Sequence, residues 1–120
     1  MADALSRRYG LVFDRVGAAL YRDGRDSVAM HGDRVLRDLP GDTLVATVSV
    51  GEPRKFVLRP RAPGEGLTLS LGWGDLVVMG GTIQRTWRHG VPKAAHAGPR
   101  ISLMFRSSQY DRALRQRQPS

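Results

Sequence analysis

The 120-residue sequence contains no cysteine, which excludes disulfides, thiolate zinc sites and a cysteine nucleophile. It also lacks any run of the 18 or so apolar residues that a membrane-spanning helix needs. The first ten residues, MADALSRRYG, lack the apolar core of a signal peptide. We therefore expect a cytoplasmic protein with no membrane partner, folded as one domain around a single modest core.

Negative charge is scarce, and so is lysine. The chain has 19 basic and 11 acidic residues, for a net charge of +8, and its only lysines are Lys55 and Lys93. A strongly basic surface fits a polyanionic partner, with nucleic acid as the first candidate. A bias toward arginine can also arise from GC-rich coding, so the charge alone leaves nucleic-acid binding open.

Helical patterns are rare and are confined to the ends of the chain. Residues 2–9 predict a short helix that stops at Gly10, and residues 110–120 predict a frayed basic helix. Between them, short β-branched and apolar runs recur every 8–12 residues, separated by glycine- and proline-rich turns. We expect strands at residues 11–21, 28–31, 43–50, 54–61, 67–71, 75–79 and 100–106, an extended run at 81–91 and a loop at 34–42. This spacing predicts a mainly all-β, antiparallel sandwich or barrel, with a double-sheet jelly roll as the obvious candidate.

The stretch MHGDRV raises the question of a metal site. Residues i and i+2 of a strand point to the same face, so His31 and Asp33 would lie side by side if the segment stays extended. A third ligand could come from His89, at a strand or strand end, or from His96, in a loop too mobile to be a preferred ligand. Two histidines and one carboxylate without cysteine form the ligand set of non-haem iron(II) oxygenases. Each histidine could instead be an exposed or hydrogen-bonded residue with no ligand role.

Two arginines frame the segment RISLMFR. Arg100 and Arg106 are six residues apart and therefore face the same side of one strand. A buried arginine needs an anion, and its planar guanidinium can hold a carboxylate through two hydrogen bonds. Near an iron site, this pair would suit a dicarboxylate co-substrate. In so arginine-rich a chain, the same spacing can also arise by chance.

The order of these motifs resembles a known family. The chain is similar to the C-terminal catalytic portion of AlkB-type Fe(II)/2-oxoglutarate-dependent dioxygenases, whose fold is a double-stranded β-helix, or jelly roll. The matching stretches are YRDGRDSVAMHGDR, VATVSVGEPRKFVLRPR, LGWGDLVVMGG, QRTWRHGVPK and PRISLMFR. The resemblance covers residues 11–107, and leaves residues 1–10 as a short N-terminal segment and 108–120 as a basic C-terminal tail.

The resemblance implies roles for individual residues. His31, Asp33 and His89 would bind Fe(II). Arg100 would hold the distal carboxylate of 2-oxoglutarate, and the Tyr21 hydroxyl would also contact this co-substrate. Arg106 would lie near the iron-chelating end of the co-substrate and near the metal-bound aspartate, and Ser102 would also belong to the co-substrate site. Tyr21 could otherwise be a core aromatic residue on a strand.

The implied reaction is oxidative demethylation of N-alkylated bases in DNA or RNA, a form of alkylation-damage repair. It consumes O2 and 2-oxoglutarate and releases succinate, carbon dioxide and formaldehyde. Because the methylated atom lies on the pairing edge, the base must be single-stranded or flipped out.

The chain departs from the family pattern at several positions. Ala19 and Ser102 stand where the family usually has asparagine, and Trp73 occupies a turn position where a histidine is expected; we expect Trp73 to pack against the fold. One lost hydrogen bond to a charged group costs about 1.5–3 kcal/mol, which should not abolish co-substrate binding.

The largest departure is at the front of the chain. Only about ten residues precede the first expected strand, whereas the family carries a nucleotide-gripping lid there. An uncovered sheet would expose edges and apolar surface, so a homodimer or marginal stability is to be expected.

Three hypotheses follow. The first is a minimal AlkB-like demethylase that uses its basic surface in place of a lid. The second is an active dioxygenase with a protein or small-molecule substrate. The third is a non-catalytic relative that binds nucleic acid through its arginines, with binding that survives His31→Ala.

Overall fold

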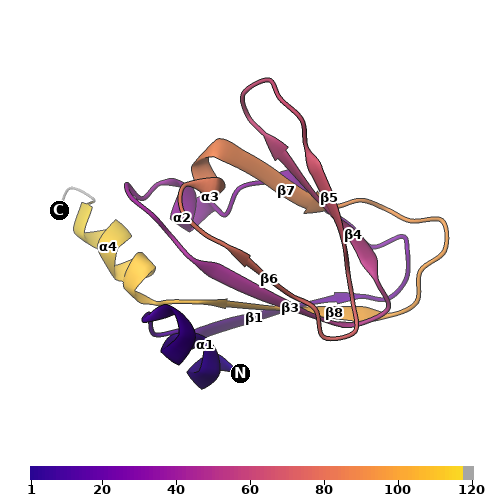
Figure 1. The fold of residues 1–120 in the computed structure, drawn as a ribbon, viewed down its shortest axis with the longest axis horizontal. Helices are drawn as coiled ribbons and strands as arrows, with labels where there is room; N and C mark the ends of the chain where they lie inside the picture. Colours follow the sequence, from indigo (N-terminus) through magenta and orange to yellow (C-terminus); the bar gives the residue numbers. More distant parts are fainter. Residues whose placement is uncertain (118–120) are drawn as a thin grey trace.

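Eight strands form two four-stranded antiparallel sheets that face each other (Figure 1). The structure is a computed structural model that describes the backbone of residues 1–117, and the side chains of these residues except 34, 35 and 114–117. The first sheet has the order β1-β8-β3-β6, with β1 (Arg15–Tyr21), β8 (Arg100–Arg106), β3 (Val45–Gly51) and β6 (Leu76–Met79). The second has the order β2-β7-β4-β5, with β2 (Val28–His31), β7 (Trp87–Val91), β4 (Arg54–Pro60) and β5 (Leu67–Leu71). The predicted antiparallel jelly roll is confirmed.

The second sheet shows the alternation expected of a half-buried strand. Along β4, Phe56 and Leu58 are buried, while Lys55 and Arg59 are exposed. These buried residues join the main core between the sheets, whose buried members are Tyr21, Leu36, Leu39, Val45, Phe56, Leu58, Leu71, Met79, Val91 and Tyr110. The period-2 pattern therefore decides which face of β4 turns inward.

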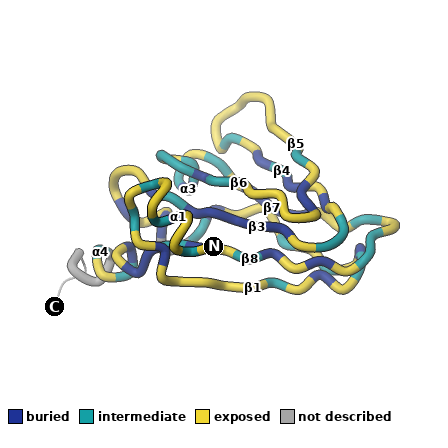
Figure 2. The backbone as a smooth tube through the Cα atoms, turned by 60° about the horizontal axis from the view of Figure 1, so that its bottom comes forward, coloured by how far each residue is buried: buried dark blue, intermediate teal, exposed yellow. Residues whose placement is uncertain are grey.

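The first sheet departs from this alternation. Its inner face combines the core residues Tyr21, Val45 and Met79 with polar residues, which are Thr47, Ser49 and Ser102, and its outer face carries apolar residues. The helix α1 (Ala2–Tyr9) covers one end of that outer face, where Leu5 packs in a second core with Phe13 and Phe105. Figure 2 shows the resulting change from exposed to buried segments across β1, β8 and β3. The predicted helix at residues 2–9 and its end at Gly10, in the left-handed conformation, are confirmed.

Four local predictions were wrong. The strand expected at 11–21 begins only at Arg15, because the preceding segment turns to bury Phe13 beneath α1. The expected loop at 34–42 contains the short helix α2 (Arg34–Arg37), and the run at 81–91 contains α3 (Ile83–Thr86) before β7. Trp73 does not pack against the fold, because it occupies a turn with φ 54° and is 68% exposed.

The C-terminal helix α4 (Gln109–Arg117) is anchored to the barrel by polar contacts. The Asp14 carboxylate accepts hydrogen bonds from the backbone N–H and the hydroxyl of Ser108, which lower the pKa of Asp14. The Tyr110 hydroxyl accepts a hydrogen bond from the Leu44 N–H at 2.8 Å. The helix predicted at 110–120 is thus confirmed to residue 117, and residues 118–120 lie outside the described part of the chain. Within that part, no helix has the length and apolar character to span a membrane.

Candidate active site

A cavity of about 150 Å³ lies between the two sheets. Tyr21, His31, His89, Arg100 and Ser102, all predicted site residues, line it. Apolar side chains complete the wall: Val28, Phe56, Met79 and Val91. The jelly roll therefore gathers residues that are up to 81 positions apart (21 to 102) around one small chamber.

The two histidines meet across the pairing of β2 with β7. His31 and His89 are direct partners in this register, and their ring centroids are 4.4 Å apart. The His31 Nδ1 lies 2.7 Å from the Ala29 carbonyl oxygen. Because a carbonyl only accepts, Nδ1 carries the proton in this contact, so the nitrogen that could face a metal is Nε2.

His89 is held in the form that a metal requires. Burial, and to a smaller extent the neighbouring His31, lower its pKa to about 4, while Asp33 opposes the shift. The ring is therefore neutral at physiological pH, as a ligating imidazole must be.

Asp33 is placed differently from the prediction, in an adjoining hollow and not in the wall of the cavity. The strand β2 ends at His31, and Asp33 instead begins α2: its backbone carbonyl accepts from the Arg37 N–H at 2.8 Å. Aspartate is a favoured residue at a helix start, which explains why the segment does not stay extended. The carboxylate lies 3.7 Å from Nη1 of Arg106. Among the described residues, no three His, Cys, Asp or Glu side chains come together as a ready metal site, so the ligand set His31, Asp33 and His89 stays a prediction.

Gln84 fixes the turn between the two predicted ligands. Its buried side-chain oxygen accepts the Asp33 N–H at 2.7 Å. A methyl group added at Gly32 would meet the Gln84 carbonyl oxygen, so only glycine fits between His31 and Asp33. Sequence analysis missed Gln84, because nothing in the local pattern marks it.

Arg100 is the most unusual residue of the cavity. It is 2% exposed, and Nη2 donates to the Ser49 hydroxyl at 2.7 Å. Its Nε and Nη1 are buried without a hydrogen-bond partner, and none of the ion pairs among the described residues includes it. Burial lowers its pKa. A buried guanidinium with two unpartnered nitrogens in the wall of a cavity fits a carboxylate-bearing ligand.

Tyr21 lies between two buried guanidinium groups. The Arg100 carbon Cζ is 4.8 Å from the ring centroid, and that of Arg54 is 5.4 Å away. Burial raises the pKa of Tyr21, so its hydroxyl keeps its proton and can donate to an anion. Arg54 donates to the backbone carbonyls of residues 23, 26 and 92, and thereby ties the loop after Tyr21 to the second sheet. This role of Arg54 was not predicted, because nothing in so arginine-rich a sequence distinguishes it from the other arginines.

Arg106 lies in an adjoining hollow with Asp33 and Met104. Its Nη2 donates to Asp111 of α4 at 3.3 Å, while Nη1 faces Asp33. Arg100, Ser102 and Arg106 alternate along the inner face of β8, as the six-residue spacing predicted.

Comparisons with known proteins agree with this arrangement. Residues 2–106 match the family model described as the 2OG-Fe(II) oxygenase superfamily. The chain is 31% identical over 117 residues to the alpha-ketoglutarate-dependent dioxygenase alkB homolog 3 of Homo sapiens, which covers 89% of this chain and 41% of that protein. It is 32% identical over 106 residues to the DNA oxidative demethylase ALKBH2 of Mus musculus, covering 81% of this chain and 44% of that protein.

Among solved structures, that of OsALKBH1 superposes with a TM-score of 0.64 at 21% sequence identity, covering 81% of this chain and 49% of the other. This likeness shows the fold alone. The chain spans about two fifths of the length of these two curated relatives.

Proposed function

Because the chain belongs to the 2OG-Fe(II) oxygenase superfamily and is of the AlkB type, we propose that it is a 2-oxoglutarate-dependent iron(II) dioxygenase that demethylates N-alkylated bases in nucleic acid. The observation that carries this proposal is the buried Arg100. Two of its guanidinium nitrogens have no partner, and the residue lines a cavity that is also lined by His31 and His89. A dicarboxylate that also ligates a metal would satisfy both ends of this cavity.

In this proposal, Arg100 binds the distal carboxylate of 2-oxoglutarate, and the protonated Tyr21 hydroxyl donates to the same co-substrate. Ser102 lines the middle of the cavity. Arg106 orients the Asp33 carboxylate through its Nη1 and is itself held by Asp111. These groups are fixed before the ligand binds, which reduces the entropy lost on binding.

His31, Asp33 and His89 would hold the iron, with Asp33 turning toward the histidine pair. The bound Fe(II), with O2 and 2-oxoglutarate, supplies the oxidation of the N-alkyl carbon. Val28, Phe56, Met79 and Val91 exclude water from the chamber in which this oxidation takes place.

A nucleic-acid substrate is supported by two features. One relative carries the name DNA oxidative demethylase, and this chain has a net charge of +8. A positive surface attracts the phosphate backbone independently of sequence. The base itself must be unpaired or flipped out to reach an enclosed chamber.

The experiment is an anaerobic titration of the purified protein with Fe(II) and 2-oxoglutarate, monitored by the visible metal-to-ligand charge-transfer band. We expect a band in the parent and none in His31→Ala. His96→Ala, which alters the exposed loop histidine, is the matched control and should keep the band. Formaldehyde release from an N-methylated oligonucleotide then tests the substrate.

The outcomes separate the hypotheses. A band with formaldehyde release supports the whole proposal. A band and succinate formation without formaldehyde from any methylated oligonucleotide would mean a dioxygenase with another substrate. No band from a folded protein that still binds nucleic acid would mean a non-catalytic relative.

A further inference from the structure

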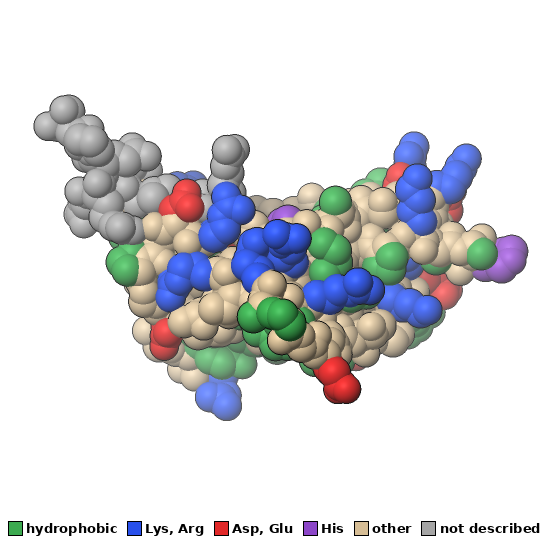
Figure 3. All heavy atoms as spheres, turned by 90° about the horizontal axis from the view of Figure 1, so that it is seen from above, with side chains coloured by type: hydrophobic (Ala, Val, Ile, Leu, Met, Phe, Trp, Pro, Cys, Tyr) green, Lys and Arg blue, Asp and Glu red, His purple; other side chains and the backbone are tan. Residues whose placement is uncertain are grey.

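The outer face of the second sheet carries positive charge and hydroxyl groups. Lys55 and Arg59 project from β4, and Arg88 projects from β7. On β5, Ser70 and Thr68 stand opposite Lys55 and Val57. Figure 3 shows lysine and arginine side chains gathered across the face seen from above, with acidic side chains toward its margins. We call Lys55, Arg59 and Arg88 the basic strip.

The charges of the basic strip lack internal compensation. Arg59 and Arg88 are direct partners in the pairing of β4 with β7, a cross-strand arrangement in which like charges are unfavourable. No ion pair among the described residues involves any of the three strip residues. By contrast, Arg22 pairs with Asp26 and Arg25 pairs with Asp23 elsewhere on the surface.

The basic strip is also long and hollowed. Lys55 and Arg59 are four residues apart on β4, or about 13 Å at the usual rise of a strand. This length corresponds to about four nucleotides of a duplex strand. A hollow of about 620 Å³ lies at the Arg59 end, lined by Arg59, Arg61 and Thr68 among others. Another, of about 430 Å³, lies at the Lys55 end and includes Ser70.

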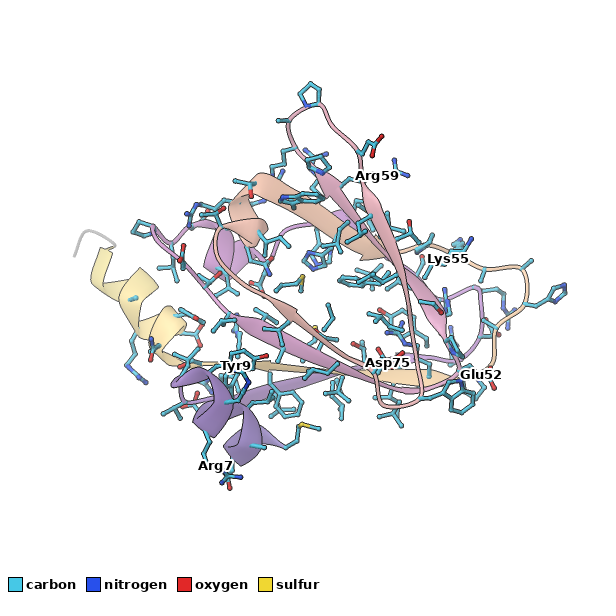
Figure 4. The ribbon with its side chains drawn as sticks, viewed as in Figure 1. Arg7, Tyr9, Glu52, Lys55, Arg59 and Asp75 are labelled. Atoms are coloured by element: carbon cyan, nitrogen blue, oxygen red, sulfur yellow. The ribbon has the colours of Figure 1, made fainter. Side chains whose placement is uncertain are left out.

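Arg61 lies in the hollow beside Arg59 and also near the turn between His31 and Asp33. The Arg61 Nη2 would lie 3.2 Å from a methyl group placed on Gly32, the residue between His31 and Asp33. A chain of positive groups thus runs from the outer face of β4 to the turn that bears two of the predicted iron ligands. Figure 4 shows Lys55 and Arg59 directed away from the space between the sheets, and Arg7 of α1 on the opposite side of the molecule.

We infer that the basic strip binds the phosphodiester backbone of the nucleic-acid strand that flanks the base in the cavity. The inference rests on the proposed function for the nature of that strand. Arginine and lysine neutralise phosphates, and the threonine and serine hydroxyls donate to phosphate oxygens, which gives affinity without reading the sequence.

The test compares two double variants that each remove two exposed arginines. Arg59→Gln/Arg88→Gln removes them from the strip, and Arg7→Gln/Arg8→Gln removes them from α1. We expect the strip variant to bind single-stranded oligonucleotides roughly tenfold more weakly at low salt, and to lower the slope of log K against log salt by about 1.4, or 0.7 per phosphate contact. The α1 variant should lie within twofold of the parent. Binding is measured with DNA, with RNA and with phosphatidylserine vesicles.

The inference is supported if the strip variant loses more affinity for DNA or for RNA than the α1 variant does, without an equal loss on vesicles. The nucleic acid that shows the larger loss of affinity is then the one that the strip binds. Equal losses in both variants would overturn it in favour of net charge alone, and an equal loss on vesicles would overturn it in favour of a general anionic surface.

Catalysis gives an independent readout. The strip variant should keep the charge-transfer band and release formaldehyde from a methylated nucleoside at the parental rate, while its KM for a methylated 12-mer rises. If the parent binds oligonucleotides through the strip but releases no formaldehyde, the proposed function is wrong and the inference about the strip is retained. If the strip variant binds and turns over the 12-mer as the parent does, the inference about the strip is wrong and the proposed function is retained.

Discussion

The two faces of the sheet β1-β8-β3-β6 differ in polarity, most clearly along β8. On β8, Arg100 and Ser102 point inward, whereas Ile101 and Leu103 point outward. In most half-buried sheets the apolar residues face the interior and the polar ones face water. Here a buried guanidinium with unpartnered N–H groups faces the interior, and Ile101 is 41% exposed on the outside.

This difference in polarity indicates that the inner face is the one that binds a ligand. A buried guanidinium without partners for its N–H groups is unstable in a dry core unless a ligand satisfies it. The opposite wall of the cavity, from the second sheet, supplies the two histidines and most of the apolar lining. In the proposed site, the first sheet would therefore bind an anion, and the second would supply two of the three metal ligands.

The most severe test of this comparison is Arg100→Met. Loss of the guanidinium should weaken 2-oxoglutarate binding by about 3 kcal/mol or more, roughly a hundredfold. Calorimetric titration of 2-oxoglutarate into the protein with a redox-inert metal such as Mn(II) measures this change.

The ligand-free Arg100→Met protein should behave in the opposite way. Because an unpaired buried charge is removed, its free energy of unfolding in urea should rise by about 1–3 kcal/mol. Arg100→Lys is the control, since lysine keeps the positive charge but cannot form bidentate hydrogen bonds to a carboxylate. Parental 2-oxoglutarate affinity in the Met variant would contradict the assignment of Arg100.

The second prediction concerns the histidine that faces this sheet. His89 has a pKa of about 4 in the folded protein, below its ordinary value of 6.5. The folded state resists protonation, so the stability of the metal-free protein should be fully present above pH 6.5 and be lost as the pH falls toward 4. The loss should reach up to about 3 kcal/mol.

Urea unfolding between pH 7.5 and 4.5, with a chelator present, measures this slope. His89→Gln should flatten it, and His96→Gln, in the exposed loop, should leave it unchanged. A parental slope in His89→Gln would assign the pH dependence to other groups.

Much of the fold could be predicted from the sequence, because each strand has a recognisable local pattern of apolar and polar residues. The alternation in β4 and β8 and the glycine-rich turns specify which residues face inward. The six-residue spacing of Arg100 and Arg106 predicted that both side chains lie on the same side of one strand, whatever the partner strands are. Four-residue helices such as α2 and α3 were missed, because one turn is too short to show helical periodicity.

The site was less accessible to prediction, because it depends on pairing between distant strands. The contact of His31 with His89 requires the register of β2 against β7, and residues 31 and 89 share no local pattern. The same holds for the Asp33 N–H bonded to Gln84 and for Arg100 bonded to Ser49, each 51 residues apart. Resemblance to a family supplied these residues as candidates, but it did not supply the hydrogen bonds that hold them.

The third prediction, smaller in effect, concerns the hydrogen bond from the Arg100 side chain to Ser49. Ser49→Ala should lower the free energy of unfolding by about 1–3 kcal/mol, because a further N–H of the buried guanidinium loses its partner. Urea unfolding measures the change, and Val50→Ala, on the outer face of the same strand, should cost less.

A double-mutant cycle sharpens this third test. In the Arg100→Met background, Ser49→Ala should have little further effect, because the donor is already gone. Additive losses in the double variant would mean that Ser49 stabilises the sheet independently of Arg100.

The smallest effect on stability is expected on the outer face, where Val16, Leu20, Val50, Leu76 and Ile101 remain exposed beyond the end of α1. Ile101→Lys should change the free energy of unfolding of the monomer by less than about 0.5 kcal/mol, since lysine at an exposed position reaches water. Ser102→Lys, one residue along and inward, should be strongly destabilising, because it places a second charge beside Arg100.

The uncovered apolar face also predicts a homodimer, since an exposed apolar patch favours self-association. Sedimentation velocity over a range of concentrations measures this: the parent should associate as concentration rises, and Ile101→Lys should remain monomeric. Leu67→Lys, which alters an exposed leucine on the other sheet, should associate as the parent does, so an equal loss in both variants would show that the contact does not lie on the outer face of the first sheet.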